Sequence, residues 1–200
     1  SMNRPTVIGL TGSIGMGKST TAAMFADAGI DVWDADAAVH RLYAPGGKAV
    51  APIRALRPEA VKGGSVDREA LKAWMKEDPS ALGQIEAVVH PLVAADRAEF
   101  IENTRADVVV LDIPLLFETG AEPEVDIIVV VSAPEDVQRA RVLDRHKMDP
   151  DTLETILAHQ MPDADKRARA DFVIETTDKE TARRQVRRAI DAVREGLEHA

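Results

Sequence analysis

The chain has 200 residues, of which 45% are hydrophobic and 30% charged, and its formal net charge is −9. This length and composition fit one soluble α/β domain with enough apolar residues to fill a core. The absence of cysteine excludes disulfides, a thiolate nucleophile and a cysteine-based zinc site. The acidic charge argues against nucleic acid as a partner. Because no apolar run approaches membrane-spanning length and no basic-then-apolar leader precedes the first strand, we also expect no membrane partner and a cytoplasmic location.

Near the N-terminus, a glycine-rich segment lies between a predicted strand at Thr6–Leu10 and a predicted helix at Thr20–Ala26. Residues 12–19 satisfy G-x-x-x-x-G-K-[ST], the pattern of a phosphate-binding P-loop. The glycines let backbone N–H groups point at a phosphate, and the helix N-terminus adds the positive end of a dipole. Lys18 supplies a charge for the β- and γ-phosphates, and Ser19 supplies a hydroxyl for Mg²⁺. The sequence therefore predicts a nucleoside triphosphate site made of Gly12, Ser13, Ile14, Gly15, Met16, Gly17, Lys18, Ser19 and Thr20.

The second predicted strand, Ile30–Trp33, leads into Asp34 and Asp36, which open a predicted helix to about Tyr43. Two carboxylates two residues apart on an extended backbone point the same way. One of them could accept the proton of an attacking hydroxyl. Aspartate is also a common N-cap of helices. The pattern leaves both interpretations open for each residue.

The stretch from Ala44 to Gly64 is rich in proline and glycine and is predicted to loop out around one short helix. Asp67 and Asp78 are predicted N-caps, and the proline after the second suits the first helical position. Helical patterning then continues to Ile101, with a break or kink expected at Pro91. This part of the chain is therefore predicted to be mainly helical.

The C-terminal half alternates strands and helices. Strands are predicted at 108–112, 125–131 and 171–174. Capping-box patterns predict the starts of two helices, at Ser132 with Glu135 and at Thr177 with Glu180. The last helix carries a row of arginines, for which a solvated face is favoured over a nucleic-acid contact. Together with the two N-terminal strands, this alternation predicts a P-loop NTPase fold with a five-stranded, mostly parallel, doubly wound sheet.

Polar groups follow three of the predicted strands. Ligands of open α/β sheets bind beyond the carboxyl ends of the strands. The P-loop follows the first strand, Asp34 and Asp36 follow the second, and Asp112 ends the third. We therefore expect these groups at one edge of the sheet, facing the triphosphate. Asp112 ends an apolar strand as a Walker-B carboxylate does, and would reach Mg²⁺ directly or through water.

Arg139, Arg141 and Arg145 lie along one predicted helix, and a helical segment to His159 follows. In nucleotide kinases such a segment forms a lid that closes over the phosphates and keeps water from the transferred phosphoryl group. A charged, exposed helix face is the alternative interpretation. The histidines show no metal-binding spacing. The sequence therefore favours a phosphoryl-transfer site over a metal centre held by histidines.

Short motifs extend in order through most of the chain. They are L-T-G-S-I-G-M-G-K-S-T at 10–20, V-W-D-A-D at 32–36, V-H-P-L at 89–92, D-I-P-L-L-F-E at 112–118, Q-R-A-R at 138–141 with Arg145, Gln160, and A-D-F-V-I at 170–174. The P-loop alone is generic, but its combination with D-A-D, H-P-L and P-L-L-F-E is specific. In this combination the chain resembles the dephospho-CoA kinase family.

The resemblance implies ATP-dependent phosphorylation of the ribose 3′-hydroxyl of dephospho-CoA, with Mg²⁺, giving CoA and ADP in the last step of coenzyme A biosynthesis. It implies a single P-loop kinase domain with a nucleotide-binding core (about 5–42, 106–143 and 167–200), a helical CoA-binding insertion (about 43–105) and a lid (about 144–166). Asp36 would be the base or orienting carboxylate, and the charges at the transferred phosphoryl group would be Lys18, Arg141 and Arg145. The acceptor site would include Asp34, His90, Leu115, Leu116 and Glu118.

The sequence departs from the pattern of the family after the last predicted strand. The family tends to have an Asn- and Asp-rich turn there that ends near a glycine and frames adenine, whereas residues 175–178 of this chain read E-T-T-D. The resemblance therefore does not identify the adenine contacts. The main rival is another small-molecule kinase of the same fold, acting on a nucleoside, nucleotide or shikimate-like acceptor. A GTPase would need an N-K-x-D motif, and the only asparagines, Asn3 and Asn103, have other contexts.

Overall fold

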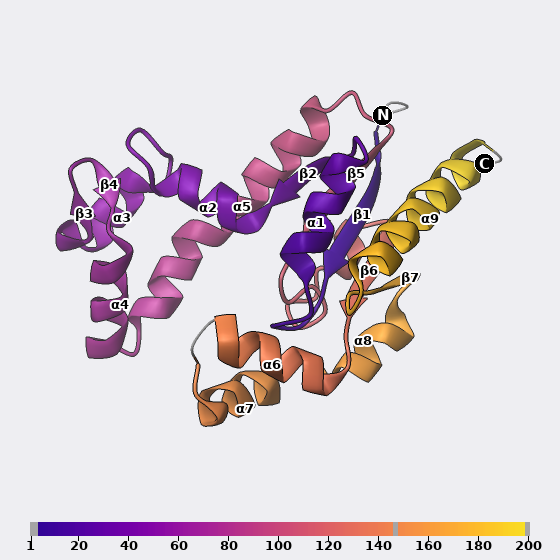
Figure 1. The fold of residues 1–200 in the computed structure, drawn as a ribbon. Helices are drawn as coiled ribbons and strands as arrows, with labels where there is room; N and C mark the ends of the chain where they lie inside the picture. Colours follow the sequence, from indigo (N-terminus) through magenta and orange to yellow (C-terminus); the bar gives the residue numbers. More distant parts are fainter. Residues whose placement is uncertain (1–3, 146–147, 199–200) are drawn as a thin grey trace. The chain divides into compact units, whose positions relative to one another are not determined.

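The computed structural model describes residues 4–145 and 148–198 of the chain. These residues form two compact units (Figure 1). The first extends to Val32 and resumes at Arg105, and the second is Trp33–Thr104. No helix within the described ranges has both the length and the apolar character that crossing a membrane requires.

The first unit is built on a parallel β-sheet. Its strands are β1 (Thr6–Thr11), β5 (Val108–Asp112), β6 (Ile127–Ser132) and β7 (Phe172–Glu175), and β2 (Asp31–Asp34), inside which the boundary between the units falls, is an edge strand. The strand order is β2-β5-β1-β6-β7. β1 pairs in parallel with β5 and β6, and β6 pairs in parallel with β7. The predicted five-stranded, mostly parallel sheet is therefore confirmed.

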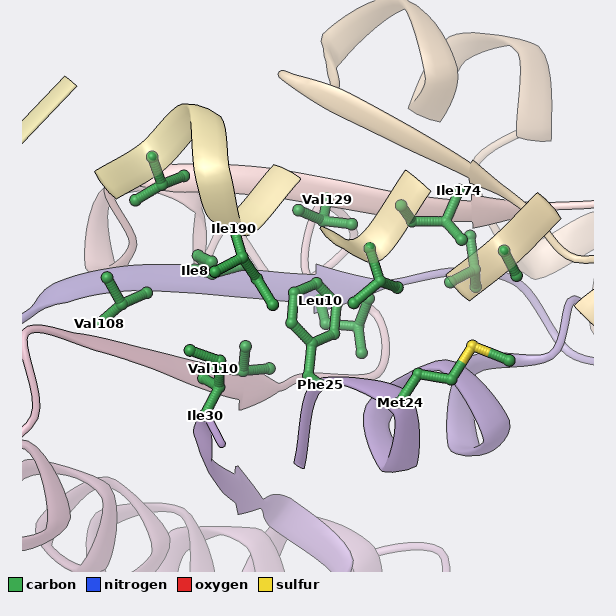
Figure 2. Packing of buried hydrophobic residues seen from close by; sticks show 14 of the residues in the cluster. Ile8, Leu10, Met24, Phe25, Ile30, Val108, Val110, Val129, Ile174 and Ile190 are labelled. Atoms are coloured by element: carbon green, nitrogen blue, oxygen red, sulfur yellow. The ribbon is translucent and has the colours of Figure 1, made fainter. Parts of the chain in front are cut away.

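Two helices of the first unit pack together on the sheet. Figure 2 shows Phe25 of α1 and Ile190 of α9 meeting Leu10 of β1, and all three side chains are fully buried. Burying a side chain of this size stabilises a protein by about 1.5–3 kcal/mol. This core anchors α1, the helix that begins at the P-loop. The helices of this unit are α1 (Lys18–Asp27), α6 (Glu135–Arg145), α7 (Pro150–His159), α8 (Asp163–Arg169) and α9 (Lys179–Glu198), with a 3₁₀ turn η2 (Glu122–Glu124).

The second unit is mainly helical, as predicted, and has a hydrophobic core of its own. Ile53, Trp74 and Ile85 lie in this core. The carboxylate of Asp96 accepts hydrogen bonds from Trp33 Nε1 at 2.8 Å and from Arg41 Nη2 at 2.6 Å. The elements are α2 (Ala35–Tyr43), α3 (Val50–Leu56), η1 (Pro58–Ala60), β3 (Val61–Lys62), β4 (Ser65–Val66), α4 (Arg68–Glu77) and α5 (Ala81–Asn103).

Two local predictions in this unit hold only in part. Of the break or kink expected at Pro91, the break is absent, because α5 continues through this residue and the exposed proline ring costs the helix a backbone bond without ending it. The segment predicted to loop out contains α3, as the one short helix expected there, but also β3, which pairs with β4 just beyond the segment. The turn of this hairpin is formed by Gly63 and Gly64 with φ of 59° and 79°. Strands of two residues are too short to show the alternation of apolar and polar residues from which strands are predicted.

The helix caps are partly as predicted. Asp67 caps α4 by accepting from the N–H groups of Glu69 and Ala70. Asp78 instead ends α4, and its carboxylate accepts from Ser80, so the next helix begins later than predicted. The two predicted capping boxes are wrong. The hydroxyl of Ser132 donates to Asp163 at 2.7 Å. At the start of α9, Asp178 rather than Thr177 accepts a hydrogen bond from a backbone N–H, that of Thr181.

Candidate active site

The P-loop lies between β1 and α1, as predicted. Gly15 and Gly17 have φ of 76° and 86°, in the left-handed region that glycine adopts without a steric penalty. A Cβ on Gly12 would come within 2.2 Å of the Val131 side chain, so glycine permits the close approach of β6. α1 begins at Lys18. The unpaired N–H groups of its first turn therefore face the loop and suit an anion.

A cavity of about 380 Å³ opens at this loop. Every residue that lines it belongs to the first unit. Three of the lining side chains are cationic although the whole chain has a net charge of −9, so the cavity concentrates positive charge in an acidic protein and suits a polyanionic ligand. Besides residues 12–20 of the P-loop, the lining residues are Pro114, Leu115, Arg141, Arg145 and Gln160.

Asp112 and Lys18 meet beside the loop. Parallel pairing sets Asp112, the last residue of β5, opposite Leu10 just before the loop. The ammonium group of Lys18 forms an ion pair with the carboxylate of Asp112, which is 5% exposed. The predicted convergence of Asp112 with the P-loop is thus confirmed. Ser19 follows in the first turn of α1, with its side chain exposed.

Arg141 and Arg145 both line the cavity, whereas Arg139 on the same helix does not. Nη2 of Arg141 donates to the carbonyl of Thr176 at 2.6 Å. Burial and the nearby charge of Arg145 lower the pKa of Arg141. Arg139 pairs with Glu135 and with a glutamate of α7. Of the three arginines, two therefore line the cavity, while Arg139 is held by ion pairs outside its lining.

The segment after β5 places its predicted residues in different surroundings. Leu115 lines the cavity with a φ of 57°, a conformation that is uncommon for a non-glycine residue and is often found at functional sites. Leu116 is fully buried. The carboxylate of Glu118 accepts from the N–H of Met161 at 2.9 Å and lies 3.0 Å from Nζ of Lys166, which is fully buried. Burial disfavours the ionised carboxyl, but the Met161 N–H and the Lys166 ammonium outweigh it and lower the pKa of Glu118.

Asp34, Asp36 and His90 lie in the second unit. Oδ1 of Asp34 accepts from the N–H of Asp36 at 2.9 Å, so Asp34 is the N-cap of α2. Asp36 is exposed in the first turn of that helix. His90 is exposed on α5. Of the two aspartates, Asp34 therefore does the capping, while Asp36 is exposed and does not cap the helix.

Two residues near the P-loop were missed as site residues. Gln138 donates from Nε2 to the carbonyl of Ile14 at 2.8 Å, and the hydroxyl of Thr176 donates to the carbonyl of Met16 at 2.6 Å. Gln138 appears in the sequence only as part of a family motif, and Thr176 lies where the chain departs from the family. Neither contact has a local sequence signal, because each depends on tertiary structure.

Comparison with known proteins decides which of the kinase families this site belongs to. The sequence model of the dephospho-CoA kinase family matches residues 6–182, which include the P-loop, the D-A-D motif and the arginines of α6. The chain belongs to the dephospho-CoA kinase family. The family resemblance that the motifs predicted is thus confirmed.

Relatives match over nearly their full length. A dephospho-CoA kinase of Cereibacter sphaeroides is 60% identical, with 96% of this chain and 98% of that protein covered. A dephospho-CoA kinase of Ruegeria pomeroyi is 55% identical with the same coverage. The crystal structure of a Thermus thermophilus protein covers 97% of this chain and 98% of its own, with 38% identity and a TM-score of 0.79. The similarity thus extends through both units of the chain.

Proposed function

We propose that this protein transfers the γ-phosphoryl group of ATP to the ribose 3′-hydroxyl of dephospho-CoA, giving CoA and ADP. The observation that carries the proposal is the cation-lined cavity at the P-loop, found in a chain that matches the dephospho-CoA kinase family over residues 6–182. The relatives that are 55–60% identical are named dephospho-CoA kinases. Phosphoryl transfer requires positioning and positive charge rather than covalent chemistry by the protein, and this cavity can supply both.

ATP phosphates would bind where the loop, the α1 N-terminus and the cavity cations meet. Backbone N–H groups of the P-loop and of the first turn of α1 would donate to phosphate oxygens, and Lys18 would contact the β- and γ-phosphates. Arg141 and Arg145 would stabilise the negative charge that develops on the transferred phosphoryl group. Oε1 of Gln160 is buried with no hydrogen-bond partner among the described residues, and this residue lines the cavity. It can accept a hydrogen bond from the ligand.

The donor set of the site fits Mg²⁺. The hydroxyl of Ser19 and the carboxylate of Asp112 are oxygen ligands of the kind that Mg²⁺ prefers. Within the described residues, no three His, Asp or Glu side chains gather as a metal site, which suits an ion held mainly by phosphates and water. When bound with ATP, Mg²⁺ would neutralise charge on the β- and γ-phosphates. Ser19 and Asp112 would hold it, directly or through water.

Asp36 would accept the proton of the attacking 3′-hydroxyl. The ribose oxygen would form a bond to the γ-phosphorus as the bond from that phosphorus to the bridging oxygen breaks, so ADP leaves and the proton resides on Asp36. Its exposed carboxylate, which does not cap α2, supports this role. In the acceptor site we propose contacts from Asp34, His90 and Leu115, with Leu116 and Glu118 supporting that segment of the chain.

We also propose that the chain works as a single kinase domain with a CoA-binding insertion at about 43–105 and a lid at about 144–166. Arg145 and Gln160, one near each end of the proposed lid, both line the nucleotide cavity. A lid here would keep water from the phosphoryl group. We place the enzyme in the cytoplasm, since its proposed reaction consumes ATP.

ADP release in a coupled assay with Mg-ATP tests the proposed function. Dephospho-CoA would be offered beside adenosine, AMP, cytidine, pantetheine, shikimate and water. We expect release to depend strongly on dephospho-CoA, with CoA identified as the product by mass. Faster turnover on another acceptor would retain phosphoryl transfer and overturn the proposed substrate, and equal release with water alone would contradict a kinase.

A further inference from the structure

Three successive backbone carbonyl groups of the P-loop accept hydrogen bonds from three side chains. Two of these side chains belong to α6, and the third follows β7. The carbonyl of Ile14 accepts from Nε2 of Gln138 at 2.8 Å. The carbonyl of Gly15 accepts from Nη1 of Arg141 at 3.3 Å. The carbonyl of Met16 accepts from the hydroxyl of Thr176 at 2.6 Å. We call these three side chains the carbonyl clamp.

The carbonyl clamp determines where the N–H groups of the loop point. In a planar trans peptide, the C=O of one residue and the N–H of the next point in opposite directions, and the described chain has no cis peptide bond. Holding the carbonyls of Ile14 and Met16 therefore turns the N–H groups of Gly15 and Gly17 away from Gln138 and Thr176. Both glycines line the nucleotide cavity, whereas Gln138 and Thr176 do not.

The middle peptide has a different task. The N–H of Met16 donates within the loop to the carbonyl of Ser13 at 3.1 Å. The Gly15 carbonyl, which belongs to the same peptide group, accepts from Arg141. Both polar groups of this peptide, its N–H and its C=O, therefore have hydrogen-bond partners. The turn that it closes lies between the N–H groups of Gly15 and Gly17.

The clamp is itself held rigidly. Gln138 is 4% exposed on α6. Thr176 accepts from Nη1 of Arg141 at 3.0 Å, and its backbone N–H donates to the carbonyl of Ser132 at 3.0 Å. Its side chain also packs on the loop, because a Cβ placed on Gly17 would lie 3.0 Å from it. Such support is what a loop with two residues at positive φ needs if it is to keep one conformation.

We propose that Gln138 and Thr176 are positioning residues for ATP, which act by aiming the Gly15 and Gly17 N–H groups at the phosphates. The inference rests on the proposed function only in that the loop binds ATP phosphates. Arg141 shares this role, but it also carries charge into the cavity, so its loss would have two effects. Gln138 and Thr176 are neutral and therefore give the cleaner test.

The test compares the full-length protein with three variants at these positions. Thr176→Val keeps the shape and removes the hydroxyl, Gln138→Met keeps most of the volume and removes the donor, and Thr176→Ser restores a hydroxyl. Thr6→Val is the matched control, because it removes the same hydroxyl at the end of β1 opposite to the loop. For each protein, the Kd for ADP is measured by calorimetry and the inhibition constant of inorganic tripolyphosphate is measured against ATP. KM values for ATP and dephospho-CoA and the thermal midpoint complete the comparison.

We expect the Kd for ADP to rise about 10-fold in Thr176→Val and in Gln138→Met, since each leaves a carbonyl of the loop without the hydrogen bond that holds it. The tripolyphosphate constant should rise with it, because this probe has phosphates but no base. The KM for dephospho-CoA should stay within about twofold, and Thr176→Ser and Thr6→Val should resemble the unmodified protein in all these values. If Gln138→Met does not fold, the three threonine variants decide alone.

An unchanged Kd for ADP in Thr176→Val, with or without a lower thermal midpoint, would overturn the proposal and leave the side chain a purely structural role. A weaker Kd for ADP with an unchanged tripolyphosphate constant would also overturn it, because the loss would then concern the base. Failure of the proposed acceptor is distinguishable, since it would appear in the unmodified protein as absent turnover on dephospho-CoA while these binding measurements remain valid.

Discussion

Substituting Lys18 would remove a cation from the cavity and would also leave Asp112 without its ion-pair partner. Its ammonium group pairs with the nearly buried carboxylate of Asp112. Lys18→Ala should lower kcat by at least about 10²–10³-fold, because the γ-phosphoryl group loses a positioned cation. It should also lower the thermal midpoint, because Asp112 loses a counter-charge in a poorly solvated place. Steady-state rates and thermal unfolding of the same sample would show both effects, and a normal kcat would remove Lys18 from the reaction.

Asp36 can be tested separately from ATP binding. Asp36→Asn should lower kcat by about 10²–10⁴-fold, the usual range for loss of a general base, and leave the KM for ATP within about twofold. Asp27→Asn, at the exposed C-terminal end of α1, is a suitable control for the change of charge. Near-normal kcat in Asp36→Asn would exclude the base role.

Glu118 makes the stability of the protein depend on pH. Its pKa is lowered in the folded state, so the ionised carboxyl stabilises the fold above the ordinary pKa of glutamate, about 4.3, and that stability is lost as the pH falls through the lower value of the folded state. Glu118→Gln should therefore reduce the acid dependence of the thermal midpoint below about pH 4.3. At neutral pH it should cost about 3 kcal/mol, because the fully buried Lys166 loses its partner. Equal acid dependence in both proteins would contradict this assignment.

At the scale of secondary structure, α6 offers a matched pair of arginines. Arg145 lines the cavity, whereas Arg139 of the same helix pairs with Glu135 and with Glu154 of α7. Arg145→Ala should lower kcat/KM by about 10²-fold, as expected when a group that stabilises transition-state charge is removed. Arg139→Ala should leave kcat/KM within about twofold, in line with the small energies of exposed ion pairs. Equal losses in the two variants would count against the lid assignment.

The elements that sequence reasoning predicted well are those with a strong local cause. Apolar, β-branched runs such as Val108–Leu111 identified the buried strands, and the glycine and lysine spacing identified the P-loop. Predictions failed where a distant partner decides. The hydroxyl of Ser132, predicted to cap a helix, instead donates to Asp163. The ion pair of Glu118 with Lys166 likewise had no signal in the sequence, because Lys166 belongs to another segment. The carbonyl clamp could not be predicted for the same reason, because its residues are far apart in the chain and meet only in the folded structure.

At the scale of the whole molecule, the nucleotide cavity belongs entirely to the first unit. ADP should therefore stabilise that unit, by about 2.7 kcal/mol when its concentration is 100 times its Kd. Far-UV circular dichroism during heating, with and without ADP, measures the effect. Adenosine at the same concentration is the control without phosphates and should shift the midpoint less. An equal shift with adenosine would mean that the phosphates contribute little to binding.

The separate core of the second unit gives the protein a built-in optical label. The chain has two tryptophans, and both are buried: Trp74 lies in that core, and Trp33 lies in β2, at the boundary between the units. Intrinsic emission excited at the red edge of protein absorption therefore reports on that core and on the boundary, whereas circular dichroism averages over the helices of both units. Recording both signals through one urea titration would distinguish a single cooperative transition from two independent ones.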